Sequence, residues 1–423
     1  MKILVVGSGG REHALCASFL RGQNVERVFC ADGNAGIGQI AELVPIKPTD
    51  IAGLAAFASR ESIDLTFVGS ETPLALGIAD EFQRHGLRIV GASKLSARLE
   101  SSKSFAKDFM DRHRIPTAGY RVARGTDEAR QILIDGSFGD SIDPVVVKAD
   151  GLAAGKGVVV APDRATAIES LDNLVETCGK DAADLIVLEE CLRGREVSLL
   201  AFCDGVEYRL MPPVRDHKRI GDGDQGPNTG GMGTIADRSL ISQELLAGIE
   251  ETIVRPTLEG CLKEGFPFRG ILFVGLMLTP QGPKVLEYNV RFGDPETQVL
   301  LPLLESDLAE LCFRMTNGDL AGFELNWSSK SAACVVLASR GYPGTPQTGD
   351  IIFGLDLAEH HPETYIYHAG TGHDETGHFI TNGGRVLGVT STGDSLEEAL
   401  DRAYVAVNDI SWNGMQFRHD IGR

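Results

Sequence analysis

The first hundred residues alternate short apolar runs with longer segments of mixed polarity. The apolar runs have the length and composition of buried strands, so we predict strands over residues 2–6, 28–31, 65–68 and 88–90. A helix is predicted to begin at Arg11, after the first strand and a glycine-rich turn. Strands that alternate with helices in this way are typical of a parallel α/β sheet, whose loops gather at the carboxyl ends of the strands.

The pattern changes in the second hundred residues. A helix is predicted over 102–112 and closes before Pro116, because the residue that precedes a proline favours an extended conformation. Two apolar runs, 144–147 and 157–160, then flank a glycine-rich turn, and an amphipathic helix is predicted over 163–178. The remaining prominent patterns predict strands over 185–188, 270–278, 331–338 and 385–390 and a helix over 396–408.

A chain of 423 residues is too long for a single core, and these patterns divide it into three units. We predict an α/β protein with an N-terminal parallel α/β domain at 1–101, a central domain at 102–323 and a smaller α+β C-terminal domain at 324–423. Within the central domain, a subdomain is predicted at about 120–188, around the glycine-rich turn.

That turn carries two lysines, Lys148 and Lys156, between its flanking apolar runs. Three glycines leave the backbone N–H groups free to face an anion, namely Gly151, Gly155 and Gly157. The turn is not a Walker A loop, because Gly157 stands where Ser or Thr would hold magnesium. We interpret the segment as a lid that grips a polyphosphate. A glycine-rich surface hairpin with solvated lysines remains the alternative at this point.

A second polar pattern lies on the predicted strand that leads to Arg291. Residues i and i+2 share a strand face, so Glu287, Asn289 and Arg291 project together. Two oxygen ligands suit a magnesium ion that bridges nucleotide phosphates, and the guanidinium suits an adjacent anion. The alternative is an ordinary polar face on a half-exposed strand, which the Asp294 and Glu296 that follow at once make less attractive.

A third polar block runs from Arg215 to Gly233 and mixes charged side chains with glycines. Such a composition cannot form a core, so we expect an exposed loop. A solvated linker is the simplest interpretation. Long loops inside compact domains are uncommon unless they are functional, however, and this one has the donors and acceptors of a substrate-binding loop.

The loop after the first predicted strand, Gly7-Ser-Gly9-Gly-Arg-Glu12, is similar to a dinucleotide-binding fingerprint. Glu12 takes the position of the third glycine, which argues against NAD and leaves phosphate or ribose binding open. His13, on the helix that follows, fits equally well as a ligand and as a residue packed on the sheet.

Composition narrows the classes of partner and compartment. The formal charge of −19 argues against nonspecific binding of nucleic acid, which depends on positive charge. Eight cysteines without paired metal-ligand spacing are typical of reduced core residues and favour a cytoplasmic location. The first strand starts directly after Met1 and no apolar run is long enough to span a bilayer, so we expect neither a signal peptide nor membrane contact.

These segments occur in the order found in the glycinamide ribonucleotide synthetase family of the ATP-grasp superfamily, which the whole chain resembles. The most specific motifs are 227–233, Pro-Asn-Thr-Gly-Gly-Met-Gly, and 291–297, Arg-Phe-Gly-Asp-Pro-Glu-Thr; weaker ones are 7–13, 33–36, 148–157, 216–219, 287–289 and 381–385. One departure is Ser70, where the family usually has proline. The resemblance implies an ATP-grasp central domain with a mobile lid. It also implies a purine-biosynthesis ligase that uses ATP to activate glycine as glycyl phosphate and then joins it to 5-phosphoribosylamine.

The resemblance also implies the roles of individual residues. ATP is expected to contact phosphate-binding lysines, the lid glycines, an adenine hinge and a ribose acceptor: Lys103, Lys148, Gly151, Gly155, Lys156, Gly157, Glu189, Glu190, Cys191, Leu192 and Glu196. The other substrates are expected at Gly9, Gly10, Asn34, Glu71, Asp216, His217, Lys218, Asn228, Thr229, Gly230, Arg291 and Asp294. Magnesium or manganese is expected at Glu287 and Asn289, and catalysis is assigned to Arg291, Lys148 and Asp216. Without the family, Glu196 fits equally well as a plain surface acid.

Two rival functions remain open on the sequence. A related ATP-grasp enzyme that activates bicarbonate to carboxylate aminoimidazole ribonucleotide would share the lid and the metal strand, and the 216–233 segment favours the glycine ligase. A noncatalytic nucleotide sensor would keep the adenine hinge but would not need an acid, an amide and an arginine on one strand face. The expected partners are glycine, 5-phosphoribosylamine and ATP, with transient contact to neighbouring purine-pathway enzymes.

Overall fold

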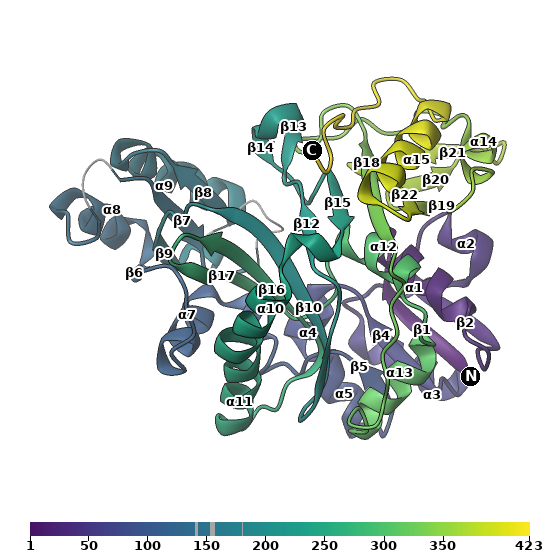
Figure 1. The fold of residues 1–423 in the computed structure, drawn as a ribbon, viewed down its shortest axis with the longest axis horizontal. Helices are drawn as coiled ribbons and strands as arrows, with labels where there is room; N and C mark the ends of the chain where they lie inside the picture. Colours follow the sequence, from purple (N-terminus) through teal and green to yellow (C-terminus); the bar gives the residue numbers. More distant parts are fainter. Residues whose placement is uncertain (140–142, 153–156, 180) are drawn as a thin grey trace.

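The computed structural model describes residues 1–139, 143–152, 157–179 and 181–423. Three main sheets and their helices form this part of the chain (Figure 1). The mixed α/β class that the sequence predicts is confirmed. No helix in these ranges is long and apolar enough to cross a membrane.

The N-terminal sheet is parallel throughout, as predicted. In the order β3-β2-β1-β4-β5, its strands are β3 (Glu42–Val44), β2 (Arg27–Asp32), β1 (Lys2–Gly7), β4 (Leu65–Val68) and β5 (Ile89–Val90). The helices of this unit are α1 (Gly10–Leu20), α2 (Ile37–Ile40), α3 (Ile51–Glu61), α4 (Glu71–Leu76) and α5 (Ile78–Arg84). The strand order reverses between β1 and β4, and sheets of this kind bind ligands at that reversal, beyond the carboxyl ends of the strands.

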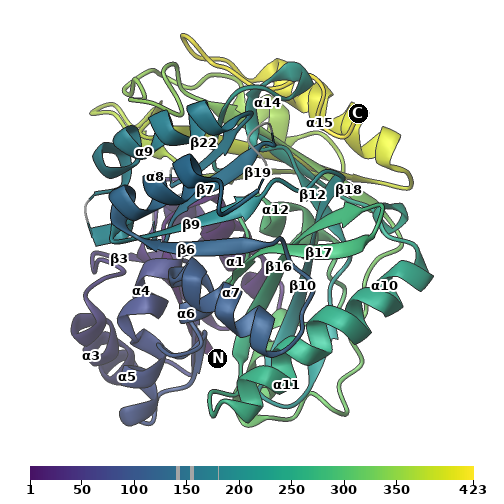
Figure 2. The same cartoon turned by 90° about the vertical axis from the view of Figure 1, so that its left-hand side faces the viewer.

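A separate antiparallel sheet carries the predicted glycine-rich turn. In the order β6-β9-β7-β8, its strands are β6 (Tyr120–Arg124), β9 (Leu185–Glu190), β7 (Val145–Ala149) and β8 (Val158–Ala161). Helices α8 (Gly125–Asp135) and α9 (Arg164–Cys178) pack on it and share a hydrophobic core that includes Leu133, Val147 and Leu171. This unit, which we call the lid sheet, projects from one end of the molecule in Figure 1 and faces the viewer in Figure 2.

The central sheet is antiparallel and contains nine strands. In spatial order they are β17 (Gly282–Asn289), β16 (Arg269–Thr279), β10 (Arg195–Asp204), β12 (Val214–Asp216), β15 (Gly233–Ala236), β18 (Ser331–Ala338), β22 (Arg385–Gly393) and β19 (Thr364–His368), with β11 (Tyr208–Leu210) paired to β10. β15 pairs with β18 through residues 233–236 and 332–335. The strands of the predicted C-terminal unit therefore extend the sheet of the central unit, and α15 (Leu396–Asp409) packs on β18 and β22.

The segment from Arg215 to Gly233, predicted to be an exposed loop, is largely ordered as strands. β12 ends at Asp216, β13 (Arg219–Gly221) and β14 (Gln225–Asn228) form an antiparallel hairpin, and β15 begins at Gly233. The side chain of His217 is buried. Residues 222–227 are exposed, as predicted, but the loop assignment was wrong because the backbone groups pair within the hairpin, while charged side chains of the hairpin pair with residues from the far end of the chain.

The remaining helices connect these sheets: α6 (Arg98–Ser101), α7 (Lys103–Arg112), α10 (Gln243–Ile249), α11 (Arg255–Lys263), α12 (Glu296–Leu300), α13 (Leu308–Asn317) and α14 (Leu355–Glu359). A small ribbon of β20 (Thr371–His373) and β21 (Phe379–Thr381) lies beside the C-terminal strands. Helix α7 begins one residue after the predicted position because Ser102 acts as its N-cap, with its hydroxyl oxygen accepting a hydrogen bond from the Phe105 N–H at 3.2 Å.

Candidate active site

A cleft of about 440 Å³ lies where the N-terminal, lid and central sheets meet. It brings together fourteen of the residues that the sequence assigned to the site: Glu71, Lys103, Lys148, Gly157, Glu189, Asp216, Lys218, Asn228, Thr229, Gly230, Glu287, Asn289, Arg291 and Asp294. All three catalytic candidates, Lys148, Asp216 and Arg291, are among them. A cleft of this size suits a small-molecule ligand.

Other predicted residues are not part of the cleft lining: Gly9, Gly10, Asn34, Gly151, Glu190, Cys191, Leu192, Glu196 and His217. Gly155 and Lys156 lie outside the described residues. Glu196 is nevertheless near, because its carboxylate lies 3.4 Å from the Lys218 ammonium group.

Two lysines on α7 and one on β7 form the cationic end of the cleft. Lys148 Nζ lies 2.8 Å from Glu189 Oε1, and Lys107 Nζ lies 2.9 Å from Glu189 Oε2. Lys103 Nζ donates a hydrogen bond to the Gly151 carbonyl at 3.1 Å. Burial lowers the pKa of Lys103, and it lowers the pKa of Lys107 to about 8. One buried carboxylate thus pairs with two lysines of the cleft lining, and the three side chains together keep a net positive charge when both lysines are protonated.

Lys107 was missed by the sequence analysis, although a signal existed. It lies four residues after Lys103 on α7, and residues at this spacing share a helix face. The Lys107 ammonium group also donates to Thr117 Oγ1 at 2.8 Å, so its position is fixed by two partners.

The predicted metal strand is β17, and its polar face opens into the cleft. Although burial opposes ionisation, the ammonium groups of Lys218, Lys148 and Lys103 lower the pKa of Glu287. Asn289 Oδ1 accepts a hydrogen bond from Arg291 Nη2 at 3.2 Å. An ionised carboxylate and an amide oxygen on one exposed face fit magnesium, which commonly takes one or two protein ligands and completes its shell with phosphates and water.

The opposite face of β17 is structural. Tyr288 is buried, and its hydroxyl lies 2.7 Å from Thr257 Oγ1. Among the described residues, no group of three His, Cys, Asp or Glu side chains is arranged to hold a metal without a ligand.

Arg291 lies between two acids from the first hundred residues. Its Nη2 is 2.8 Å from Glu100 Oε1, and its Nε is 3.4 Å from Glu71 Oε2. Burial raises the pKa of Glu100. Burial also opposes ionisation of Glu71, but Arg291, Arg11 and hydrogen bonds together lower its pKa. Glu100 had no assigned role in the sequence analysis, because its partner lies 191 positions away in the printed chain.

The other end of the cleft joins β12, α12 and β22. Burial, and after it the Glu296 carboxylate, raise the pKa of Asp216 well above its ordinary value. Arg385 Nη1 donates to the carbonyls of Gly230 at 2.6 Å and Asp294 at 2.7 Å. Arg385 is the last residue of the 381–385 motif, which the sequence analysis recognised without assigning this side chain to the site.

Two predicted or open residues use their hydrogen bonds inside the fold. Asn34 Nδ2 donates to the carbonyls of Ser8 at 2.8 Å and His368 at 2.9 Å, and its Oδ1 accepts from the Ile37 N–H at 3.0 Å. His13 Nδ1 accepts from the His368 N–H at 2.8 Å, and burial lowers the pKa of His13 to about 3. The geometry thus favours packing over ligand binding for His13, and it ties the N-terminal unit to β19.

The glycines of the first loop serve close packing at the edge of the cleft. A Cβ on Gly9 would stand 3.0 Å from Asp294 Oδ2, and one on Gly10 would stand 2.7 Å from Gln298 Nε2. Their neighbour Arg11 lines the cleft and donates to the Phe292 carbonyl at 3.0 Å. These glycines let the loop approach the 292–298 segment.

Three family models match successive parts of the chain. They describe the N, ATP-grasp (A) and C domains of phosphoribosylglycinamide synthetase and match residues 1–100, 101–297 and 332–423. A curated protein from Caldanaerobacter subterraneus subsp. tengcongensis, named phosphoribosylamine–glycine ligase, is 45% identical over 422 residues, covering 100% of this chain and 99% of that protein.

Comparison with solved structures agrees with the family models. A crystal structure of phosphoribosylamine–glycine ligase from Thermotoga maritima has a TM-score of 0.84 and 34% sequence identity, and the match covers 99% of this chain and 100% of that chain. The N5-carboxyaminoimidazole ribonucleotide synthetase from the same organism has a TM-score of 0.64 and 17% identity, with 97% and 99% coverage. At that identity the second likeness establishes a shared fold and nothing more.

Proposed function

Because the chain belongs to the phosphoribosylglycinamide synthetase family, we infer that it uses ATP to join glycine to 5-phosphoribosylamine, forming glycinamide ribonucleotide, ADP and phosphate. This is a carbon–nitrogen ligation of purine biosynthesis. The single observation that carries the assignment to this cleft is the charge arrangement at Glu287, whose carboxylate is influenced by Lys218, Lys148, Lys103 and Arg291 together. Four cations around two oxygen ligands suit a nucleotide triphosphate with its metal.

The chemistry requires activation of the glycine carboxylate. A carboxylate oxygen attacks the γ-phosphorus of ATP, the bond to the β-phosphate oxygen breaks, and ADP leaves. Such a transfer depends on positioning and on neutralising charge at the transferred and leaving oxygens. Lys103 and Lys148 would bind the phosphates, and Arg291 would neutralise charge on the transferred group. A divalent cation held by Glu287 and Asn289, magnesium or manganese, would supply further charge neutralisation.

In the second half of the reaction, the amine of 5-phosphoribosylamine attacks the carbonyl carbon of glycyl phosphate. The carbon–oxygen bond to phosphate breaks, phosphate leaves, and the amine nitrogen loses a proton. Asp216 lines the cleft at this end, and its carboxylate would accept that proton. Asn228, Thr229 and Gly230 line the same end and would contact the substrates.

The proposed adenine site is the segment after β9, from Glu189 to Leu192, with Glu196 as the ribose acceptor. Its support is position: Glu189 lines the cleft beside Lys148, and Glu196 lies beside Lys218.

The three proposed domains are 1–101, 102–323 with a lid at about 120–188, and 324–423. All eight cysteines, each within the described residues, are free thiols, which supports a reducing cytoplasm. Contact with neighbouring purine-pathway enzymes stays a prediction.

ADP formation tests the function directly. We expect ADP to form when glycine and freshly generated 5-phosphoribosylamine are both present, and to fall to background when either is omitted. Bicarbonate should not replace glycine. Strong ATP turnover with bicarbonate and aminoimidazole ribonucleotide, and none with glycine, would show that the protein is the related carboxylating enzyme instead.

A further inference from the structure

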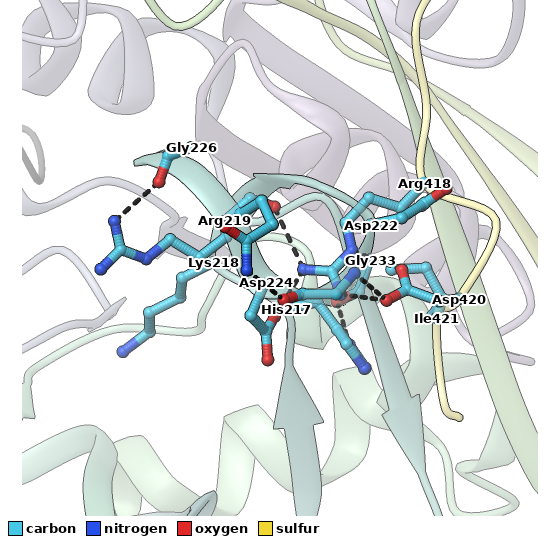
Figure 3. A network of polar contacts seen from close by, with 12 residues as sticks. His217, Lys218, Arg219, Asp222, Asp224, Gly226, Gly233, Arg418, Asp420 and Ile421 are labelled. Atoms are coloured by element: carbon cyan, nitrogen blue, oxygen red, sulfur yellow. Dashed lines mark hydrogen bonds and ion pairs between the residues drawn. The ribbon is translucent and has the colours of Figure 1, made fainter.

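The last residues of the chain pack against the β13–β14 hairpin, and Figure 1 places the C-terminus beside these two strands. We call residues 418–422 the C-terminal tail. Arg418 is 1% exposed and lies at the centre of the contact (Figure 3). Its Nη1 donates to Asp224 Oδ1 at 2.7 Å and to the Arg219 carbonyl at 3.2 Å, both on the hairpin. A single buried guanidinium therefore holds both sides of the hairpin turn.

Asp420 completes this contact from the tail. Arg418 Nε and Nη2 donate to the two Asp420 carboxylate oxygens at 2.7 and 2.8 Å. Asp420 Oδ2 also accepts from the Gly223 N–H at 2.7 Å, and the His419 N–H donates to Asp222 Oδ1 at 2.7 Å. The tip of the hairpin is thus bonded to the tail through both backbone and side-chain groups.

A second connection reaches the base of the hairpin through His217. The Gly422 N–H donates to His217 Nε2 at 3.1 Å, so that nitrogen must carry a lone pair. His217 Nδ1 lies 3.1 Å from the Gly233 carbonyl, which can only accept. Burial, followed by the charge of Arg215, lowers the pKa of His217 to about 4, which matches the neutral ring that this arrangement requires. His217 therefore connects the tail to β15 instead of pointing into the cleft.

The hairpin and its base carry two residues of the cleft lining, of which Lys218 lies beside the metal strand. Asp216 and Lys218 flank His217 in sequence, and alternation along an extended chain points their side chains away from the tail and toward the cleft. Lys218 Nζ lies 3.9 Å from Glu287 Oε1. The Thr229 N–H and hydroxyl both donate to the Lys218 carbonyl, at 2.7 and 2.8 Å, so the position of Lys218 follows that of the hairpin.

The end of the chain is anchored by contacts other than those of the Arg418 guanidinium. Ile421 is fully buried, and the Tyr404 hydroxyl lies 3.1 Å from its N–H and donates to the Arg418 carbonyl at 2.8 Å. Those contacts already fix the tail to α15. Burying the Arg418 guanidinium has a desolvation cost that offsets its ion pairs, so these pairs add little net stability. Its hydrogen bonds to the hairpin and the tail nevertheless restrict how the two segments lie relative to each other. The geometry defined here is that of the hairpin.

We propose that Arg418 is a positioning residue for the amino-acid end of the cleft, which it serves by holding the β13–β14 hairpin so that Asp216 and Lys218 line the cleft, with Lys218 beside Glu287. The inference rests on the proposed function, in which Asp216, Asn228, Thr229 and Gly230 lie at the substrate end of the cleft, and it assigns glycine to this end. Arg418 itself touches no substrate. Of the four cations near Glu287, only Lys218 moves with the hairpin, whereas Lys103, Lys148 and Arg291 lie on other segments. Loss of Arg418 should therefore weaken glycine binding more than ATP binding.

Steady-state kinetics of ADP formation test the proposal with matched variants. Arg418→Ala should raise the KM for glycine about tenfold while the KM for ATP stays within about twofold, as expected for an indirect loss of charge-assisted hydrogen bonds. Arg418→Lys should recover part of the effect, because lysine keeps the charge without the fork. Asp224→Asn should raise the glycine KM in the same direction and by less, and its 72% exposed side chain makes a folding defect no concern.

Arg209→Ala is the matched control. Arg209 also joins distant segments through its guanidinium, donating to the carbonyls of Leu320 at 2.7 Å and Ala321 at 2.9 Å, but it lies outside the cleft lining. It should lower the melting temperature and leave both KM values unchanged. If Arg418→Ala behaves like Arg209→Ala, with lower stability and an unaltered glycine KM, Arg418 is structural and the proposal is wrong. Should Arg418→Ala not fold, the Asp224→Asn and Arg418→Lys variants decide by the same criterion.

Hydrogen exchange separates this proposal from the function on which it rests. In the protein without ligands, Arg418→Ala should speed amide exchange in residues 217–229 and leave the lid sheet unchanged. Unchanged exchange in 217–229 would overturn the proposal, whatever the kinetics show. If the parent protein formed no glycine-dependent ADP, the proposed function would fail, and the exchange measurement would still decide whether Arg418 holds the hairpin.

Discussion

Nearby cations keep the Glu287 carboxylate ionised. It lines the cleft with 41% of its side chain exposed, and the surrounding lysines keep its pKa low despite partial burial. Glu287→Gln preserves the shape and removes the charge that a divalent cation requires. We expect activity to fall by roughly two orders of magnitude, as for loss of one preorganised electrostatic contact. Raising the magnesium concentration should recover part of the loss.

Tyr288 is the control for this test because it lies on the opposite, buried face of β17. Tyr288→Phe removes a buried hydroxyl contact with Thr257 and should leave the magnesium dependence unchanged. Full turnover with a parental magnesium titration in Glu287→Gln would show that β17 does not hold the metal. The ligase assignment itself would stand in that case.

The lowered pKa of Lys107 predicts a pH dependence of activity. Burial lowers its pKa to about 8, so it is charged below that pH and neutral above it in the free protein. Loss of this charge leaves Glu189 to pair with Lys148 alone and removes positive charge from the phosphate end of the cleft. We therefore expect kcat/KM for ATP to fall as the pH rises above about 8.

Two variants separate Lys107 from other groups that titrate in this range. Lys107→Met should lower kcat/KM for ATP at pH 7 and abolish the alkaline decline. Lys107→Arg keeps its charge at every accessible pH, so its decline should move to higher pH. The measurement is kcat/KM for ATP from pH 6.5 to about 9.5. This span reaches only the lower edge of the pH range in which an ordinary lysine loses its proton. An alkaline decline that persists in Lys107→Met would assign it to another group.

At the scale of elements, local patterns predicted what local forces determine. β1, β4 and β18 are apolar runs, and their predicted ends agree with the structure to within a residue. The 287–291 pattern likewise placed Glu287 and Asn289 on one face because strand alternation is a local rule. The β13–β14 hairpin was missed since Arg418, which pairs with its Asp224, lies 194 residues later. Glu100 and Arg385 were missed for the same reason, because each is defined by a partner distant in sequence.

The lid sheet should respond to the nucleotide as a unit. In the structure Lys148, on β7, is paired with Glu189, on β9, and ATP phosphates offer Lys148 a competing partner. We expect ATP with magnesium to protect residues 148–160 from limited proteolysis, whereas adenosine, which lacks phosphates, should give no protection. Cleavage at equal rates in both conditions would contradict a phosphate-gripping lid.

At the scale of the whole molecule, the continuous central sheet couples two of the proposed domains. β15 and β18 pair over four residues, and Arg385 on β22 bonds to Gly230 and Asp294 at the cleft. A glycine at the joint is constrained from several sides: a Cβ on Gly233 would stand 2.6 Å from the Cys334 carbonyl oxygen and 2.6 Å from Ile421 Cδ1. The joint between the two domains therefore has no space for a larger side chain.

Gly233→Val should consequently destabilise strands on both sides of the joint. We expect faster hydrogen exchange in β10 and in β22, with protection in the N-terminal and lid sheets retained. The matched control is Leu133→Ala in the lid core, where the residue is fully buried. It should cost roughly 2–5 kcal/mol locally and speed exchange in residues 120–190 alone. If Gly233→Val loosened only residues 324–423, the C-terminal strands would be an independent unit that merely rests against the central sheet.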